Sequence, residues 1–391
     1  MNRIVVTLAL CVICASTHAQ TYVKEFDAKK KCTETFLHSV ALPEGNWKVT
    51  VTLGSDKQAG NTTIRTESSR LMLENIMTKK GEKITKTFTV NIRNTRLEDG
   101  RSVKLKKDDR KLNWDDSLNF EFAGPAPSVR SIVIEPSKAP TVFLFGDSTV
   151  CDNEGEPYAS WGQMVTAFFD SDIAFANYAE SGETTNSCLG SRRFDKGLSQ
   201  MKAGDYVFLE FGHNDEKQTR PGSGPWYLYS TNLKIMIDRV REIGAHPVLL
   251  TPTQRRRWNK DGGLIDSHGE FPDAMRTVAQ RENTPLIDLT EMTTTMYLSL
   301  GDEASKALLV HIPAGSVEGL TRDIKDNTHF SAFGAYQVAK CVTQGIYDKI
   351  PELARHIKEG WTVFDPSKPD SPESFIWAPR PFYAFAKPRG N

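Results

Sequence analysis

The pattern of apolar residues changes at Pro136-Ser-Lys-Ala-Pro140, and this change limits the fold more than any other feature of the chain. Before it, segments such as 47–53 and 86–92 alternate between apolar and polar residues, which is typical of strands buried on one face. After it, continuous apolar strands are separated by longer helical stretches, which predicts a parallel sheet covered by helices on both faces. We therefore expect an antiparallel β-sandwich followed by an α/β domain.

Four segments follow from this division. Residues 22–136 form the smaller sandwich domain, and residues 137–359 form the α/β domain. Residues 360–391 are rich in proline and aromatic residues, and we expect them to pack back over the domains as a strap without regular structure. Residues 1–19 form a leader. The expected strands of the parallel sheet are 142–145, 174–178, 206–211, 247–251 and 286–289.

The N-terminus has the order of residues found in secretory signal peptides. Arg3 precedes an apolar run from residue 4 to residue 15, and Ser16-Thr-His-Ala19 favours cleavage after Ala19. No later apolar run is long enough to span a bilayer. We therefore expect a secreted or periplasmic protein.

Charge and cysteine content narrow the classes of partner. The 49 basic and 49 acidic residues leave no net charge, which gives no electrostatic reason to expect nucleic acid or an anionic membrane as partner. Four cysteines follow the leader, and in an exported protein they permit disulfides with three alternative pairings. Their wide spacing does not suggest a zinc site, and we expect no metal and no cofactor. The oligomeric state is left open. The four cysteines are Cys32, Cys151, Cys188 and Cys341.

Three residues have the chemistry of a nucleophilic apparatus. Ser148 lies just beyond the C-terminal end of the first predicted parallel strand, where ligands approach such sheets. Asp326 and His329 are three residues apart, so one helical turn would place both side chains on the same side. A serine, a histidine and an orienting acid can together attack an ester. Taken singly, the serine turn and the Asp-x-x-His segment are equally well explained as helix caps.

Two further turns can supply donors to a developing oxyanion. Gly182 lets its backbone N–H approach a ligand closely, and Asn214 can donate its side-chain amide. His213, beside it, is expected to be a buried support and not a second base. The expected convergence of these turns on one rim of the sheet favours a serine hydrolase. Gly146-Asp-Ser-Thr-Val150 lacks the second glycine of the Gly-x-Ser-x-Gly elbow.

At four blocks the chain resembles the SGNH, or GDSL, hydrolase superfamily. The blocks are Gly146-Asp-Ser148, Gly182, Gly212-His-Asn214 and Asp326-x-x-His329. The resemblance implies an α/β fold of the flavodoxin-like, three-layer type, with Ser148 as nucleophile, His329 as general base and Asp326 as its orienting acid. It also implies an oxyanion hole made by the backbone N–H groups of Ser148 and Gly182 and by the side chain of Asn214.

Within the superfamily the blocks are most similar to those of rhamnogalacturonan acetylesterases, which remove acetyl groups from pectin. The sandwich resembles the galactose-binding-like modules of some bacterial members. This implies a secreted carbohydrate esterase acting on acetylated polysaccharide or oligosaccharide. Two alternatives remain: a broader acyl esterase or lipase of the same superfamily, and a carbohydrate-binding protein with little catalysis. As a further hypothesis, Arg256 pairs with uronate carboxylates of the substrate and Trp258 stacks on a sugar face, although a charged run is usually a solvated loop.

Overall fold

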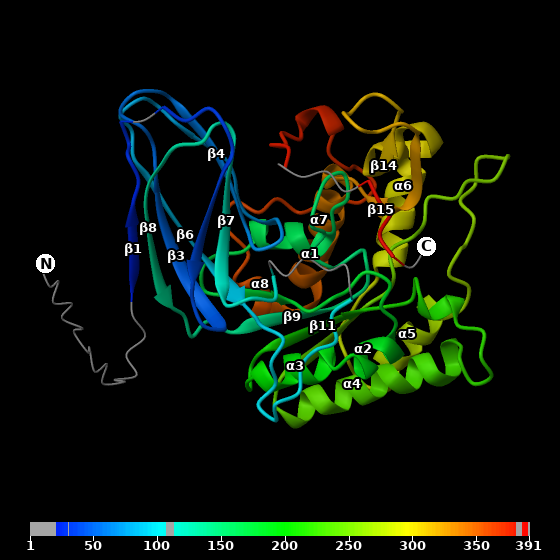
Figure 1. Cartoon of the computed structure of the whole chain (residues 1–391). Coiled ribbons are helices and arrows are strands. Elements are labelled where there is room, and N and C mark those ends of the chain that lie inside the picture. Colours follow the sequence, from blue (N-terminus) through cyan, green and yellow to red (C-terminus); the bar gives the residue numbers. More distant parts are fainter. Residues whose placement is uncertain (1–20, 30, 107–112, 381–384, 390–391) are drawn as a thin grey trace, which may run out of the picture.

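The computed structural model describes residues 21–29, 31–106, 113–380 and 385–389. The predicted leader, residues 1–19, lies outside the described residues. Figure 1 shows a β-rich unit built from the first third of the chain beside a mixed unit of helices and strands. In the described part of the chain no helix is both long and apolar enough to cross a membrane.

The first unit consists of two four-stranded antiparallel sheets, with strand orders β1-β8-β3-β6 and β2-β7-β4-β5. In the third strand every second residue from Trp47 to Leu53 is buried, as the alternating pattern predicts. The antiparallel sheets are thus confirmed, while the galactose-binding-like assignment stays a prediction. The strands are β1 (Tyr22–Glu25), β2 (Phe36–Ala41), β3 (Gly45–Leu53), β4 (Gly60–Thr66), β5 (Arg70–Thr78), β6 (Ile84–Ile92), β7 (Ser117–Ala126) and β8 (Val129–Pro136).

The second unit is built on a five-stranded sheet in the order β10-β9-β11-β12-β13, and every pairing in it is parallel. This confirms the predicted parallel sheet. The last strand is shorter than expected, because Asp288 accepts a hydrogen bond from the Glu291 N–H and starts a helix there. The strands are β9 (Thr141–Gly146), β10 (Ala174–Asn177), β11 (Tyr206–Glu210), β12 (His246–Leu250) and β13 (Leu286–Ile287).

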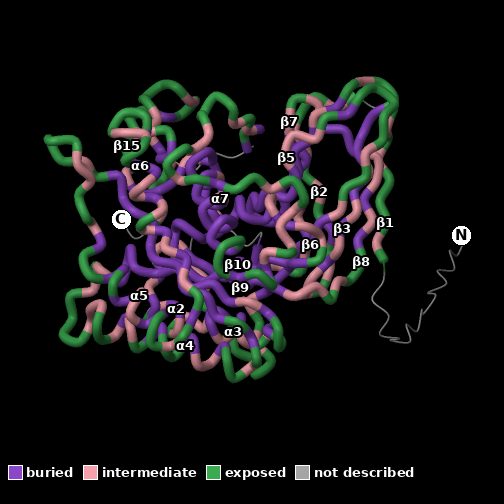
Figure 2. Tube along the Cα trace, turned by 180° about the vertical axis from the view of Figure 1, so that it is seen from behind, coloured by how far each residue is buried: buried purple, intermediate pink, exposed green. Residues whose placement is uncertain are grey.

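Helices cover both faces of this sheet. Successive residues of β9 belong to different apolar clusters: Val142 and Leu144 to one, Phe143 and Phe145 to the other. The first cluster includes residues of α1, α6 and α7, and the second includes residues of α3, α4 and α5. The sheet is therefore the middle of three layers, and the trace is buried along β9 and much of α7 (Figure 2). The helices are α1 (Trp161–Met164), α2 (Thr185–Gly190), α3 (Arg193–Gln200), α4 (Ser230–Glu242), α5 (Phe271–Arg281), α6 (Leu289–Ser305), α7 (Ala332–Lys349) and α8 (Pro351–Ala354).

Shorter elements complete the unit. An antiparallel pair, β14 (Leu309–Ile312) and β15 (Ile324–Phe330), precedes α7. Short helical turns of the unit are η1 (Val165–Phe168), η2 (Asp215–Lys217), η3 (Pro225–Tyr229) and η4 (Lys306–Leu308), and a further turn, η5 (Pro372–Ser374), lies in the C-terminal segment.

The C-terminal segment from residue 360 crosses both units. The Phe375 ring packs against Tyr336 of α7, with centroids 5.1 Å apart. The Arg65 guanidinium of β4 lies 4.6 Å from the Trp377 ring. Arg380 is buried and donates to the Tyr158 carbonyl oxygen at 2.6 Å. The segment is therefore ordered by side-chain contacts to both units, without regular structure of its own from 375 to 380.

The four cysteines of the described chain are all free thiols. Cys151, Cys188 and Cys341 are buried, and Cys32 is half-buried. None of the three alternative pairings is formed among the described residues.

Candidate active site

The turn after β9 presents Ser148. The N–H groups of Val150 and Cys151 both donate to the Asp147 carbonyl oxygen, at 3.1 and 2.9 Å, and close the turn directly after the strand. Gly146 is required here because a Cβ would lie 2.7 Å from the Glu210 carbonyl oxygen of the neighbouring strand. The close approach of two parallel strands therefore explains why the block begins with glycine.

Ser148, His329 and Asp326 form a continuous hydrogen-bonded chain. The His329 Nε2 atom lies 3.0 Å from Ser148 Oγ, and its Nδ1 atom lies 2.7 Å from Asp326 Oδ2. Burial opposes ionisation of Asp326, but its hydrogen bonds to the His329 ring and to backbone N–H groups leave its pKa below the usual value. The carboxylate is therefore charged beside the imidazole at neutral pH.

The local structure of the Asp326 segment differs from the helical turn considered from the sequence. Both residues belong to β15, where side chains three apart normally point to opposite faces. The Asp326 Oδ1 atom accepts from the N–H groups of Thr328 and His329, at 2.9 and 3.1 Å. These hydrogen bonds turn the backbone back locally, so the Asp326 carboxylate reaches the imidazole ring of His329 in the same strand.

The two further oxyanion candidates follow β10 and β11, at the same end of the sheet as Ser148. Gly182 has a φ of 78°, a left-handed conformation that glycine adopts without strain. The Asn214 side chain donates to the Glu183 carbonyl oxygen at 3.1 Å and accepts from Lys217 Nζ at 3.1 Å. An amide nitrogen has two N–H bonds, so this fixed side chain keeps one for a ligand.

The segment that carries these catalytic candidates is similar to known proteins. Residues 144–335 match the GDSL-like Lipase/Acylhydrolase family. The rhamnogalacturonan acetylesterase RhgT of Bacillus subtilis (strain 168) is 38% identical over 218 residues, which cover 55% of this chain and 93% of the relative. The chain belongs to the GDSL-like lipase/acylhydrolase family. It is a serine esterase, and the predicted SGNH hydrolase domain is confirmed.

Two other proteins of the same bacterium are also similar to this chain. The probable rhamnogalacturonan acetylesterase YesY is 30% identical over 222 residues, covering 56% of this chain and 98% of the relative. The uncharacterized esterase YxiM is 25% identical over 283 residues, covering 71% of this chain and 68% of the relative.

His213 lies next to Asn214 but points into the protein. It is 1% exposed, and its Nε2 atom lies 3.2 Å from Thr253 Oγ1. Burial, followed by the nearby positive groups, lowers its pKa well below the usual value. His213 is therefore buried within the protein, as predicted, and its lowered pKa keeps the ring neutral at pH 7.

A pair of buried acids, Asp147 and Glu210, lies beneath the serine turn. Thr149 Oγ1 lies 3.0 Å from Asp147 Oδ1 and 3.1 Å from Glu210 Oε1, between the two carboxyl groups, and Trp161 Nε1 donates to Glu210 at 2.7 Å. Burial and repulsion from Asp147 raise the pKa of Glu210 to about 8. Its position at the end of an apolar strand gave no sign of this pairing in the sequence.

The sandwich contacts the serine turn through Asp152. The Asp152 Oδ2 atom accepts from Arg70 of β5 at 2.8 Å and lies 3.3 Å from Arg93 Nη2. The Asp152 Oδ1 atom accepts from Asn177 Nδ2, which also donates to the Val150 carbonyl oxygen at 2.7 Å. A continuous set of buried polar contacts thus links the sandwich to the turn that carries the nucleophile.

Arg256 and Trp258, the predicted substrate-binding residues, are both engaged by contacts within the protein. Arg256 is 5% exposed and donates to Ser305 and Asn327 at 3.0 Å, and it forms an ion pair with Asp302. All three guanidinium nitrogens are thus bonded to protein oxygens. Trp258 is half-buried and packs against the apolar cluster of α6 and α7. Their role in substrate binding stays a prediction, and these contacts oppose it.

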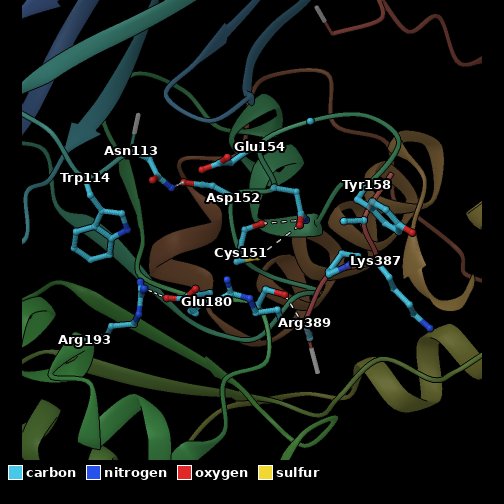
Figure 3. Close-up of a pocket in the computed structure, with 16 residues that line it drawn as sticks. Asn113, Trp114, Cys151, Asp152, Glu154, Tyr158, Glu180, Arg193, Lys387 and Arg389 are labelled. Atoms are coloured by element: carbon cyan, nitrogen blue, oxygen red, sulfur yellow. Dashed lines mark hydrogen bonds and ion pairs between the residues drawn. The ribbon is translucent and has the colours of Figure 1, made fainter. Parts of the chain in front are cut away.

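Two cavities flank the catalytic residues. The smaller, about 240 Å³, lies between Trp114 of the sandwich, Ser181 and the end of the strap (Figure 3). Its lining includes Tyr158, whose ring packs edge-on against His329 with centroids 5.8 Å apart. The larger, about 740 Å³, is lined by residues that include Thr328, next to the catalytic histidine. Lys387 lines both cavities.

Proposed function

We propose that this esterase hydrolyses O-acetyl esters on pectic polysaccharide of the rhamnogalacturonan type. The hydrogen bonds that link Ser148 to His329 and His329 to Asp326 support the esterase part of the proposal. The substrate part rests on the 38% identity to RhgT across nearly the whole of that relative. A binding protein with little catalysis is disfavoured, because the three groups already have the hydrogen-bonded geometry that catalysis needs.

In this mechanism Ser148 Oγ attacks the acetyl carbonyl carbon while His329 Nε2 takes the hydroxyl proton. Asp326 holds the Nδ1–H of the ring and stabilises the imidazolium that forms. The bond from the carbonyl carbon to the sugar oxygen then breaks, and the sugar oxygen takes the proton from His329. A water molecule, deprotonated by the same ring, cleaves the acetyl-serine and releases acetate.

The negative oxygen of the tetrahedral intermediate needs donors that are fixed before the reaction begins. We assign this role to the backbone N–H groups of Ser148 and Gly182 and to the second N–H of Asn214. The bonds from Asn214 to Glu183 and Lys217 hold the amide in place, so its orientation costs little during the reaction.

The first test is hydrolysis by Ser148→Ala. We expect kcat for an aryl acetate to fall by at least about 10⁴-fold, because the nucleophile is lost while the other groups remain. The melting temperature should change little, since a single hydroxyl is removed. Persistence of most of the activity in a folded variant would refute the assignment of the nucleophile.

The second test is acetate release by the wild-type enzyme from acetylated rhamnogalacturonan, acetylated xylan and a small aryl acetate. We expect the highest kcat/KM on rhamnogalacturonan. A preference for xylan, or activity on the aryl ester alone, would contradict the proposed substrate. The family also includes acyl esterases of other kinds, so a series of aryl esters from acetate to laurate should accompany the panel. Faster hydrolysis of the long chains would favour the broader esterase or lipase.

Export is part of the proposal, because an acetylated cell-wall polysaccharide lies outside the cell. It is supported by the apolar run from residue 4 to residue 15 and the small residues that follow it. Mass spectrometry of the protein produced by secretion should give a mature N-terminus at Gln20. A mature chain that still begins at Met1 would oppose it.

A further inference from the structure

The larger cavity beside the catalytic histidine has an excess of positive charge. Two acidic residues line the cavity. One is Glu216, whose two carboxylate oxygens already contact Arg255 and His268, the latter at 2.8 Å. The other carboxylate of the lining, Glu270, is exposed. Compared with these two acids, the lining contains four basic residues: Lys217, Arg255, Arg257 and Lys387. The balance favours an anionic ligand.

Arg257 presents its side chain to this cavity, and no residue in the described part of the chain competes for it. Of the three consecutive arginines, Arg255 is paired with Glu216 and Arg256 with Asp302, and both are buried. The Arg257 side chain is exposed and has no hydrogen-bond or ion-pair partner among the described residues. Its planar guanidinium can bind a carboxylate through two parallel hydrogen bonds.

Lys387 reaches the same cavity from the C-terminal strap, outside the family match at 144–335. Its Nζ atom lies 3.7 Å from Asp326 Oδ2, which is too long for a hydrogen bond, and the side chain is 46% exposed. In Figure 3 it points away from the other labelled residues of the smaller cavity. Asp326 keeps its hydrogen bond to His329 without this contact, so the lysine is able to turn toward an incoming anion.

We propose that Arg257 and Lys387 form a carboxylate-binding subsite for a uronic acid residue of the substrate. The inference rests on the proposed function and adds the groups that select the substrate. A volume of about 740 Å³ lies within the usual range of small-molecule sites, about 300–1,000 Å³, and exceeds what an acetyl group needs. The strap thereby completes a site that the family domain begins.

The first experiment compares Arg257→Met and Lys387→Met with wild type on two forms of one acetylated rhamnogalacturonan oligosaccharide. One form has free carboxylates, and the other has methyl-esterified carboxylates. We expect KM on the free form to rise about tenfold in each variant, with kcat nearly unchanged and less than about twofold effects on the esterified form. Equal effects on both forms, or none on the free form, would overturn the subsite.

The matched control is Lys368→Met, which removes the same charge from the same strap. Its side chain is 82% exposed, pairs with Asp365 at 3.6 Å and lines neither cavity. It should behave as wild type on both substrates. A tenfold effect here would show that the net charge of the strap, and not a site, governs binding.

A second experiment does not require the oligosaccharide to be a substrate. Unacetylated digalacturonate should inhibit aryl acetate hydrolysis by the wild-type enzyme, less so at high salt, and about tenfold more weakly in Lys387→Met. If no acetylated glycan releases acetate but this inhibition is found, the proposed function fails and the subsite stands. If the dimethyl ester inhibits equally well, or neither compound inhibits, the subsite is refuted.

Discussion

Replacing Asp152 by asparagine tests whether the sandwich supports the turn that carries the nucleophile. The Asp152 side chain is fully buried and lies between Arg70 and Arg93, whose side chains are 1% exposed. Asparagine keeps the shape of the side chain but removes the charge that both arginines share. With its oxygen toward Arg70, its amide nitrogen faces Asn177 Nδ2, so Asn177, which links this cluster to the backbone of the serine turn, loses its acceptor here.

The expected loss of stability follows from the burial. Removing one partner of a buried ion pair costs about 3–5 kcal/mol, because a charge is left buried without compensation. The asparagine oxygen still accepts from Arg70, and Arg93 keeps its contact with the Trp114 ring at 4.7 Å. We therefore expect the lower end of the range, about 3 kcal/mol, together with a reduced kcat as the turn loses its support.

Equilibrium denaturation at pH 7 measures this loss, with Asp172→Asn as control. Asp172 pairs with Lys48 at 3.3 Å between the same two units, but its side chain is 70% exposed, so the same substitution should cost less than about 1 kcal/mol. Equal effects of the two substitutions would refute the role of the buried cluster.

The pH dependence provides an internal check on the same variant. Burial opposes the charge on Asp152, but Arg70 and Arg93 outweigh it and lower the pKa below 3.8. The stabilising contribution is therefore present above pH 3.8 and is lost as the pH falls below that value. The difference between wild type and Asp152→Asn should shrink in that range, and a difference that grows there would contradict the assignment of charge.

Two further variants test the surroundings of the nucleophile. The pKa of Glu210 is raised from 4.5 to about 8, so its contribution to stability is complete below pH 4.5 and is lost as the pH rises toward 8. Denaturation midpoints between pH 5 and 8 should decline less in Glu210→Gln than in wild type, and an unchanged slope would show that Glu210 does not titrate there. Asn214→Ala should lower kcat by about 10²–10³-fold with a KM within a few-fold, as measured on an aryl acetate. A decrease in kcat of less than about tenfold would show that Asn214 is not part of the oxyanion hole.

The parallel sheet and the meeting of the catalytic residues were predictable, because each block directly follows or precedes an element with a clear apolar pattern. Ser148 and Asn214 follow continuous apolar strands whose ends must lie at one edge of a parallel sheet. The way Asp326 reaches His329 was not predictable, because the spacing alone does not distinguish a helical turn from a strand folded back by its own aspartate.

Contacts between distant segments account for what the sequence did not reveal. No local pattern predicts the ion pair of Arg256, because its acceptor, Asp302, is 46 residues away. The contact of Asp152 with Arg70 spans 82 residues and two units. The aromatic residues of the strap predict packing, and no sequence pattern indicates that Lys387 at its basic end lies beside the catalytic acid.

Covalent labelling of the intact enzyme with a fluorophosphonate, followed by peptide mass spectrometry, tests the central claim most directly. The reagent reacts with a serine only when a base activates it and an oxyanion hole accepts its oxygen. We predict a single adduct on Ser148 in the wild-type enzyme, much slower labelling in His329→Ala and none in Ser148→Ala. An adduct on a different residue, or labelling of Ser148 at the same rate without His329, would contradict the proposed catalytic site.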